Sequence, residues 1–196
     1  ARILSHGAQR ICAGELEQAA RRYDFEMPQA DYERITSAKT AELYASACEL
    51  GARYPASPDV ESGPLARDMR AFGEELGLAF QIIDDVLDLT GDASVVGKSV
   101  GNDVEDGKIT LPVLKVYRDS DETVRAAMRH AYQGPVEGSR MEALRAACDL
   151  GPGIEFARER ALELLHRALE RVHSLPEGAA RTSLVQLTEY VASRQK

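Results

Sequence analysis

The feature that most constrains this chain is the run from Phe72 to Leu89, in which apolar and acidic residues recur at helical spacing. In a helix, a step of about 100° per residue gathers four polar side chains on roughly one third of the circumference. These are Gln81, Asp84, Asp85 and Asp88. The opposite side carries Leu76, Ala79, Phe80, Ile83 and Leu87. One face of the expected helix is therefore apolar, and the other is a cluster of carboxylates.

Three acids within five residues, Asp84, Asp85 and Asp88, repel one another unless a cation neutralises them. Mg²⁺ suits this pattern because it prefers oxygen ligands and is commonly held by one or two carboxylates together with substrate phosphate oxygens. The alternative is a solvated acidic patch on a surface helix. The pattern by itself leaves both interpretations open.

The rest of the chain also reads as helical, since no period-two pattern of a strand persists anywhere. The expected helices span residues 3–23, 32–50, 65–90, 110–131, 141–150, 154–173 and 179–194. Gly51 is expected to cap the second of these helices, and Gly151-Pro152-Gly153 to separate two others. Residues 91–107 hold four glycines and are expected to form a long loop. The predicted class is all-α.

Charge and composition exclude several kinds of partner. The 196-residue chain has a formal net charge of −8, which argues against nucleic acid or an anionic membrane surface. Its longest run without a charged residue, Leu76 to Ile83, is far too short for the ~20 residues of a spanning helix. Three widely separated cysteines, Cys12, Cys48 and Cys148, indicate neither a disulfide framework nor a zinc site. A reducing, cytoplasmic compartment is expected.

Lysines beside small residues provide the positive charge that an anionic substrate needs. Lys39-Thr40 lies among serines and alanines, and the long loop contains Gly97-Lys98 and Gly107-Lys108. A glycine beside a lysine lets a loop approach an anion closely. Together with a metal ion, Lys39, Lys98 and Lys108 could hold a diphosphate.

Six short sequence blocks, taken in order, resemble the C-terminal half of a trans-isoprenyl diphosphate synthase, a family also called polyprenyl synthetases. The matching blocks are GExxQ (Gly14 to Gln18), KT (Lys39-Thr40), GLAFQIIDDVLD (Gly77 to Asp88), GK (Gly97-Lys98), GND (Gly101 to Asp103) and GKITLP (Gly107 to Pro112). Each block alone is weak evidence, but six in this order are specific. The resemblance covers essentially residues 1–196, which would form the C-terminal part of a single isoprenoid synthase domain.

The resemblance implies a prenyltransferase that ionises an allylic diphosphate and adds isopentenyl diphosphate head-to-tail, in a helical bundle and as a homodimer. Asp84, Asp85 and Asp88 would bind Mg²⁺ that bridges to the allylic diphosphate, and Lys39, Lys98 and Lys108 would hold the same diphosphate. Thr40 and Gln81 would place oxygens near the allylic cation. These roles are what the resemblance to the family implies, and spacing alone does not establish them.

The chain also departs from that family. It lacks the first aspartate-rich motif and the basic site for isopentenyl diphosphate, both of which the family places on earlier helices. The chain begins inside an expected helix at Ala1, which suggests a piece of a longer protein that is inactive alone. Two alternatives stay open: a truncated or regulatory subunit of such an enzyme, and a class I terpene synthase.

Overall fold

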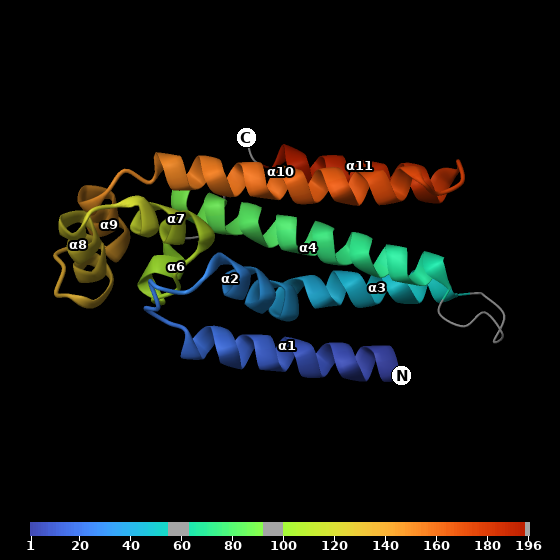
Figure 1. Ribbon diagram of the computed structural model, residues 1–196, viewed down its shortest axis with the longest axis horizontal. Helices are drawn as coiled ribbons and strands as arrows, with labels where there is room; N and C mark the ends of the chain where they lie inside the picture. Colours follow the sequence, from blue (N-terminus) through green and yellow to red (C-terminus); the bar gives the residue numbers. More distant parts are fainter. Residues whose placement is uncertain (55–62, 92–99, 195–196) are drawn as a thin grey trace. The chain divides into compact units, whose positions relative to one another are not determined.

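The computed structural model describes residues 1–54, 63–91 and 100–194, and Figure 1 follows its helices along the chain. They are α1 (Arg2–Ala20), α2 (Gln29–Thr36), the π-helix η1 (Ser37–Ala41), α3 (Glu42–Arg53), α4 (Pro64–Thr90), α6 (Asn102–Glu105), α7 (Leu111–Asp119), α8 (Glu122–Gln133), α9 (Arg140–Ala147), α10 (Gly151–His173) and α11 (Ala179–Ser193). No strand occurs in the part of the chain that is described, so the predicted all-α class is confirmed. Within the same ranges, no helix is long and apolar enough to cross a membrane.

The second predicted helix ends later than its glycine suggested. The expectation that Gly51 caps it is wrong, because α3 continues to Arg53 and the extended residue Tyr54 follows it. Arg53 donates hydrogen bonds to Glu49 one turn earlier, at 2.7 and 3.1 Å. This pair stabilises the last turn, where a glycine costs only about 1 kcal/mol relative to alanine.

The helix predicted over residues 110–131 is in fact two helices. It breaks at Ser120 and Asp121, both extended, and the Asp121 side chain caps α8 by accepting the Val124 N–H at 3.0 Å. The guanidinium of Arg125 satisfies the carbonyls of Tyr117 and Arg118 at the end of α7, at 2.9 and 2.7 Å. A cap residue and an arginine that satisfies two terminal carbonyls together stabilise this break.

Gly151-Pro152-Gly153 is also not the separator that was predicted, since it forms the first turn of α10. Proline is well tolerated there because the first N–H groups of a helix have no partner within the helix. The predicted loop over residues 91–107 contains the short helix α6, while residues 92–99 lie outside the described residues.

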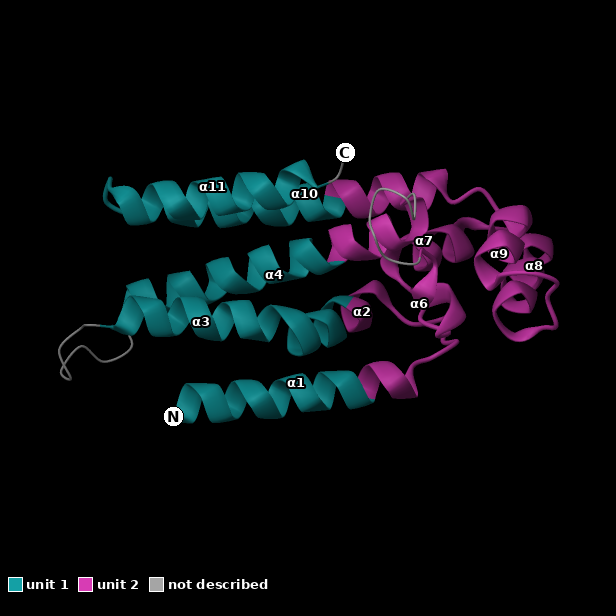
Figure 2. Ribbon diagram, turned by 180° about the vertical axis from the view of Figure 1, so that it is seen from behind, with its two compact units in different colours: residues 1–16, 33–81, 160–196 teal, residues 17–32, 82–159 magenta. Residues whose placement is uncertain are grey.

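The chain divides into two compact units, coloured separately in Figure 2. Unit 1 contains residues 1–16, 33–81 and 160–196, and unit 2 contains residues 17–32 and 82–159. Residues 64–81 of α4 therefore belong to unit 1 and residues 82–90 to unit 2.

Unit 1 is built on very close packing between helices. A Cβ added at Gly77 would lie 2.7 Å from Ala41 Cα, and one added at Gly73 would lie 2.5 Å from the carbonyl oxygen of Tyr44. These two glycines of α4 lie one turn apart, so α4 can approach η1 and α3 at backbone distance. The buried residues Phe72 and Leu76 of the same helix contribute large side chains to the core of this unit.

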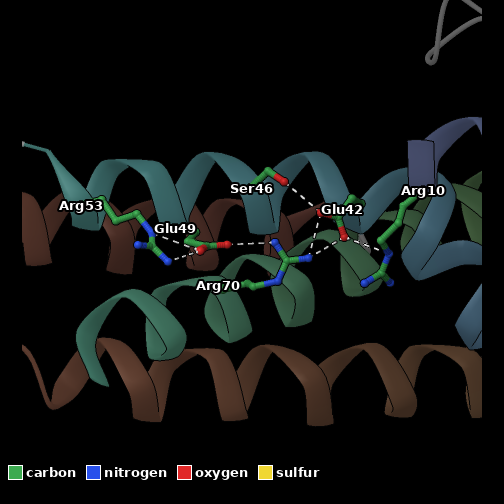
Figure 3. A network of polar contacts seen from close by, with 6 residues as sticks. All are labelled: Arg10, Glu42, Ser46, Glu49, Arg53 and Arg70. Carbon is green, nitrogen blue, oxygen red and sulfur yellow. Dashed lines mark hydrogen bonds and ion pairs between the residues drawn. The ribbon is translucent and has the colours of Figure 1, made fainter. Parts of the chain in front are cut away.

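A polar network around Glu42 joins three helices of unit 1 (Figure 3). Glu42 is 2% exposed and accepts hydrogen bonds from Arg70 at 2.8 and 2.6 Å and from Ser46 at 2.9 Å. Arg10 of α1 lies 3.2 Å from the same carboxylate. Burial alone would raise the pKa of Glu42, but the bonds from Arg70 and Ser46 outweigh it and hold that pKa below its ordinary value.

Unit 2 has an aromatic core at its centre. The ring of Phe25 lies 4.7 Å from that of Tyr117 and 5.2 Å, edge to face, from that of Tyr132. Tyr132 is fully buried, and Val86 and Leu89 of α4 are buried in the same unit. The end of α4 that carries the three aspartates therefore also contributes apolar residues to this unit.

Candidate active site

The acidic end of α4 places its three aspartates in different surroundings. Asp85 is buried, whereas Asp84 and Asp88 are half-buried. The hydroxyl of Tyr32 donates to Asp85 Oδ2 at 2.6 Å. The helical spacing that the sequence predicted for these aspartates is present, since α4 runs without a break from Pro64 to Thr90.

Asp88 is held by the start of α6. Its two carboxylate oxygens accept the backbone N–H groups of Asn102 and Asp103 at 3.2 and 3.0 Å. Burial raises the pKa of Asp88 above its ordinary value, and the nearby negative charge of Asp103 adds to this, while the backbone donors oppose it.

Lys108 follows α6, and both its side chain and its backbone carbonyl make polar contacts. Its ammonium group lies 2.6 Å from Asp103 Oδ1, and its carbonyl oxygen accepts a hydrogen bond from the Tyr132 hydroxyl at 3.3 Å. Burial lowers the pKa of Lys108, but the hydrogen bond to Asp103 and the negative charges of Asp103, Asp106 and Asp85 together outweigh burial and leave the pKa raised. The preceding residue, Gly107, has a φ of +75° and its carbonyl accepts the N–H of Tyr23 at 2.8 Å. Glycine is favoured there because other residues rarely adopt this conformation.

The Lys39-Thr40 pair lies in η1, a π-helix that the sequence did not reveal. Thr40 donates its hydroxyl to Gln81 Oε1 at 3.1 Å, and Lys39 Nζ lies 3.2 Å from Glu15. A Cβ added at Gly14 of α1 would lie 2.7 Å from the backbone nitrogen of Lys39, so α1 packs directly against this segment. Short π-helical segments are uncommon and often occur at functional sites.

The predicted site residues thus fall into two groups, each inside one unit. Unit 1 brings together Thr40 and Gln81, with Lys39 next to Thr40 in η1. Unit 2 brings together the three aspartates and Lys108, which reaches Asp88 through Asp103. Lys98 lies outside the described residues, so its role stays a prediction.

Sequence reasoning missed the contact that Tyr32 makes. Nothing in the residues around it signals a role, because its partner Asp85 lies 53 positions later in the chain. Asp103 did carry a signal, since it lies in the GND block, but its ion pair with Lys108 could not be read from spacing. Long-range side-chain contacts of this kind depend on tertiary packing.

The carboxylate oxygens at the end of α4 suit a hard divalent cation. Carboxylate oxygens are the ligands that Mg²⁺ prefers, and Asp85 and Asp88 are oriented by a tyrosine hydroxyl and by backbone N–H groups. Among the residues that the structure describes, no three His, Cys, Asp or Glu side chains gather closely enough to enclose an ion by themselves. Such a site would rely on water and substrate oxygens for the remaining ligands, as is usual for Mg²⁺.

Comparisons with known proteins show similarity over most of the chain. The polyprenyl synthetase family model matches residues 1–149. Component 2 of heptaprenyl diphosphate synthase from Geobacillus stearothermophilus is 36% identical over 193 residues, covering 98% of this chain and 58% of that protein. Octaprenyl diphosphate synthase from Escherichia coli strain K12 is 29% identical over 195 residues, which cover 99% of this chain and 59% of that protein. The chain therefore spans little more than half the length of these curated relatives.

Solved structures show the same fold. The crystal structure of a decaprenyl diphosphate synthase from Rhodobacter capsulatus matches with a TM-score of 0.87 and 28% identity, covering 100% of this chain and 59% of that one. A polyprenyl synthase from Caulobacter crescentus, solved with calcium and isoprenyl diphosphate, matches with a TM-score of 0.84 and 30% identity over 100% of this chain and 58% of that one. The all-α architecture is therefore that of the isoprenoid synthases. With its motifs, its fold and the family match in agreement, this chain belongs to the polyprenyl synthetase family.

Proposed function

We propose that this chain carries the allylic-diphosphate side of the active site of a prenyl diphosphate synthase. The proposed reaction breaks the allylic carbon–oxygen bond, releases diphosphate with the bonding electron pair, and joins the allylic carbon to the double bond of isopentenyl diphosphate. Loss of a proton from the new cation then restores a double bond. Relatives named as heptaprenyl and octaprenyl diphosphate synthases support this activity.

The observation that carries the proposal is the arrangement of Asp84, Asp85 and Asp88 at the end of α4. Two of the three are held in place, Asp85 by the Tyr32 hydroxyl and Asp88 by two backbone N–H groups. Bound there, Mg²⁺ would neutralise charge that builds up on the leaving diphosphate. These aspartates would hold the ion, and Mg²⁺ is the cofactor that we propose.

The lysines would contribute fixed positive charge to the same diphosphate. An ammonium group has three N–H donors, so Lys108 can keep Asp103 and still donate to a phosphate oxygen. Lys39 has the same capacity beside Glu15. Lys39, Lys98 and Lys108 would therefore orient the leaving group in the ground state and stabilise its charge as the bond breaks.

Thr40 and Gln81 would act on the other fragment, the allylic cation. Because Thr40 donates its proton to Gln81, the lone pairs of its hydroxyl oxygen stay available to a positive charge. The oxygens of these two residues are weak nucleophiles held in place by each other, so they can stabilise a nearby cation electrostatically. We assign both residues to substrate binding and to catalysis.

The complete site needs residues that this chain does not contain. We propose that residues 1–196 form the C-terminal part of a single isoprenoid synthase domain that works in the cytoplasm as a homodimer. One relative is component 2 of heptaprenyl diphosphate synthase, and this name favours a second candidate, in which this chain acts with another subunit. The relatives reported above are named as prenyl diphosphate synthases, which favours either candidate over a class I terpene synthase.

A radiolabel incorporation assay tests the proposal. The 196-residue chain is incubated with Mg²⁺, labelled isopentenyl diphosphate and allylic diphosphates of several lengths, alone and with a co-expressed N-terminal half taken from a relative. We expect no product from the chain alone, because a cation formed in an open, wet site is quenched by water. Turnover restored by the added half supports the proposal. Equal turnover without it would show that the site is built differently.

A further inference from the structure

Tyr32 holds a carboxylate of the acidic motif from outside that motif. Its hydroxyl donates to Asp85 Oδ2 at 2.6 Å, and both residues are only 5% exposed. Hydroxyl-to-carboxylate bonds of this length are charge-assisted and about twice as strong as neutral ones. The contact lies wholly inside unit 2, and packing of this unit, not local sequence, brings the two residues together.

Resting on the function proposed above, we propose that Tyr32 is a positioning residue for the metal ligand Asp85. Fixing one carboxylate oxygen sets the plane of the whole group, and that plane decides where the other oxygen meets an ion. Hydrogen-bond partners of ligating carboxylates typically contribute about 10–100-fold to metal affinity or activity. The phenol is neutral at physiological pH, so it orients Asp85 and leaves the charge that attracts the cation.

Asp88 shows the same principle with a different donor. Two backbone N–H groups hold it, at 3.2 and 3.0 Å, and these donors are also neutral. Only proline would remove a backbone donor, and it would also restrict the backbone, whereas the Tyr32 hydroxyl can be removed without changing the ring. Tyr32 is therefore the point at which orientation of the motif can be tested separately from its charge.

A structural role for Tyr32 makes a different prediction. If the hydroxyl only satisfies a buried carboxylate, Tyr32→Phe will lower the melting temperature and leave metal affinity unchanged. If it positions Asp85, the variant will bind metal more weakly while it is fully folded. The matched control is Tyr117→Phe, which removes another buried hydroxyl of unit 2, one that contacts Arg129 and not the acidic motif.

The test measures Mn²⁺ binding to the 196-residue chain in the presence of inorganic diphosphate, by electron paramagnetic resonance of the free ion. The variants are Tyr32→Phe, Asp85→Asn, the double variant and Tyr117→Phe, each checked for folding by circular dichroism. We expect Kd to rise about 10-fold in Tyr32→Phe and to stay unchanged in Tyr117→Phe. In the Asp85→Asn background, removing the Tyr32 hydroxyl should add nothing further.

The outcomes separate this inference from the proposed function. If Asp85→Asn weakens Mn²⁺ binding and Tyr32→Phe does not, the positioning role is wrong and the metal site stands. If the two substitutions weaken binding independently, Tyr32 acts elsewhere and the inference is also wrong. If Asp85→Asn itself leaves Kd unchanged, Asp85 is not a metal ligand, and both the inference and the assignment of Asp85 to the proposed site are overturned.

Discussion

Unit 1 and unit 2 each bury a carboxylate, but the groups that donate hydrogen bonds to it are charged in unit 1 and uncharged in unit 2. In unit 1, Glu42 is surrounded by the guanidinium groups of Arg70 and Arg10, so its charge is neutralised on site. In unit 2, Asp85 accepts a hydrogen bond from a hydroxyl and Asp88 accepts two from backbone N–H groups, which orient the carboxylates and carry no formal charge. The first arrangement suits a structural tie between helices, and the second suits carboxylates that can bind a cation. Hydrogen-bond satisfaction alone would not distinguish them.

The largest expected effect is the loss of activity when an aspartate of unit 2 is replaced. Asp84→Ala in the complete enzyme should lower kcat by about 10²–10³-fold, the size of effect seen when one preorganised electrostatic contact is lost. Asp119→Ala is the control, an exposed carboxylate of unit 2 that is paired with Lys115 at 2.8 Å. Steady-state kinetics at saturating substrate provides the measurement. Equal losses in both variants would remove the metal assignment.

Replacing Glu42 in unit 1 should lower the free energy of unfolding and leave diphosphate binding unchanged. Glu42→Ala leaves Arg70 and Arg10 without their shared partner, and breaking a buried ion pair costs about 3–5 kcal/mol. Because both arginines can still reach solvent, we expect about 2–3 kcal/mol, measured by urea unfolding. Diphosphate affinity should not change.

Glu163→Ala provides the control for that experiment. Glu163 is exposed and pairs with Arg160 at 2.9 Å, so its loss should cost less than about 0.5 kcal/mol. A similar destabilisation in both variants would mean that burial of the Glu42 pair contributes nothing special.

The lysines provide a smaller test on the diphosphate. Lys98→Ala should weaken binding of a non-hydrolysable allylic diphosphate analogue by about 10-fold, or about 1.4 kcal/mol, because one ammonium contact is lost. The melting temperature should stay nearly constant. Lys115→Ala, which removes a lysine paired with Asp119 on α7, is the control. Unaltered calorimetric affinity in Lys98→Ala would assign Lys98 to a solvated surface.

The smallest expected effect is on the pH dependence of the unfolding free energy, which depends on the charge of Glu42. Because its folded pKa lies below the ordinary value of 4.5, Glu42 binds a proton more readily in the unfolded chain. Its contribution is therefore complete above that value and is lost as the pH falls through the folded pKa. The difference in unfolding free energy between the natural chain and Glu42→Gln should be constant near pH 7 and shrink below about pH 4. A difference that does not change with pH would show that the Glu42 charge is unimportant.

Periodicity predicted the main frame of this molecule well. Helix α4 begins and ends within one residue of its predicted bounds, and its aspartates share a face as expected. Prediction failed where two local signals compete, as at Ser120-Asp121, where cap residues interrupt an apolar pattern that would otherwise continue. It also failed for contacts such as Tyr32 with Asp85, because the packing that creates them involves the whole of unit 2.

The π-helix at Ser37–Ala41 has a consequence for how this sequence can vary in length. A π turn accommodates one residue more than an α turn, so η1 is equivalent to a single-residue insertion inside an otherwise α-helical segment. Because the wider turn absorbs the extra residue, the α-helical segments on either side of it stay nearly in phase. Deleting one residue there would restore α geometry and leave α2 and α3 facing nearly the same way, but it would remove the wide turn that carries Lys39 and Thr40. The cost of such a deletion should therefore fall on the site residues of η1 more than on the packing of the helices that flank it.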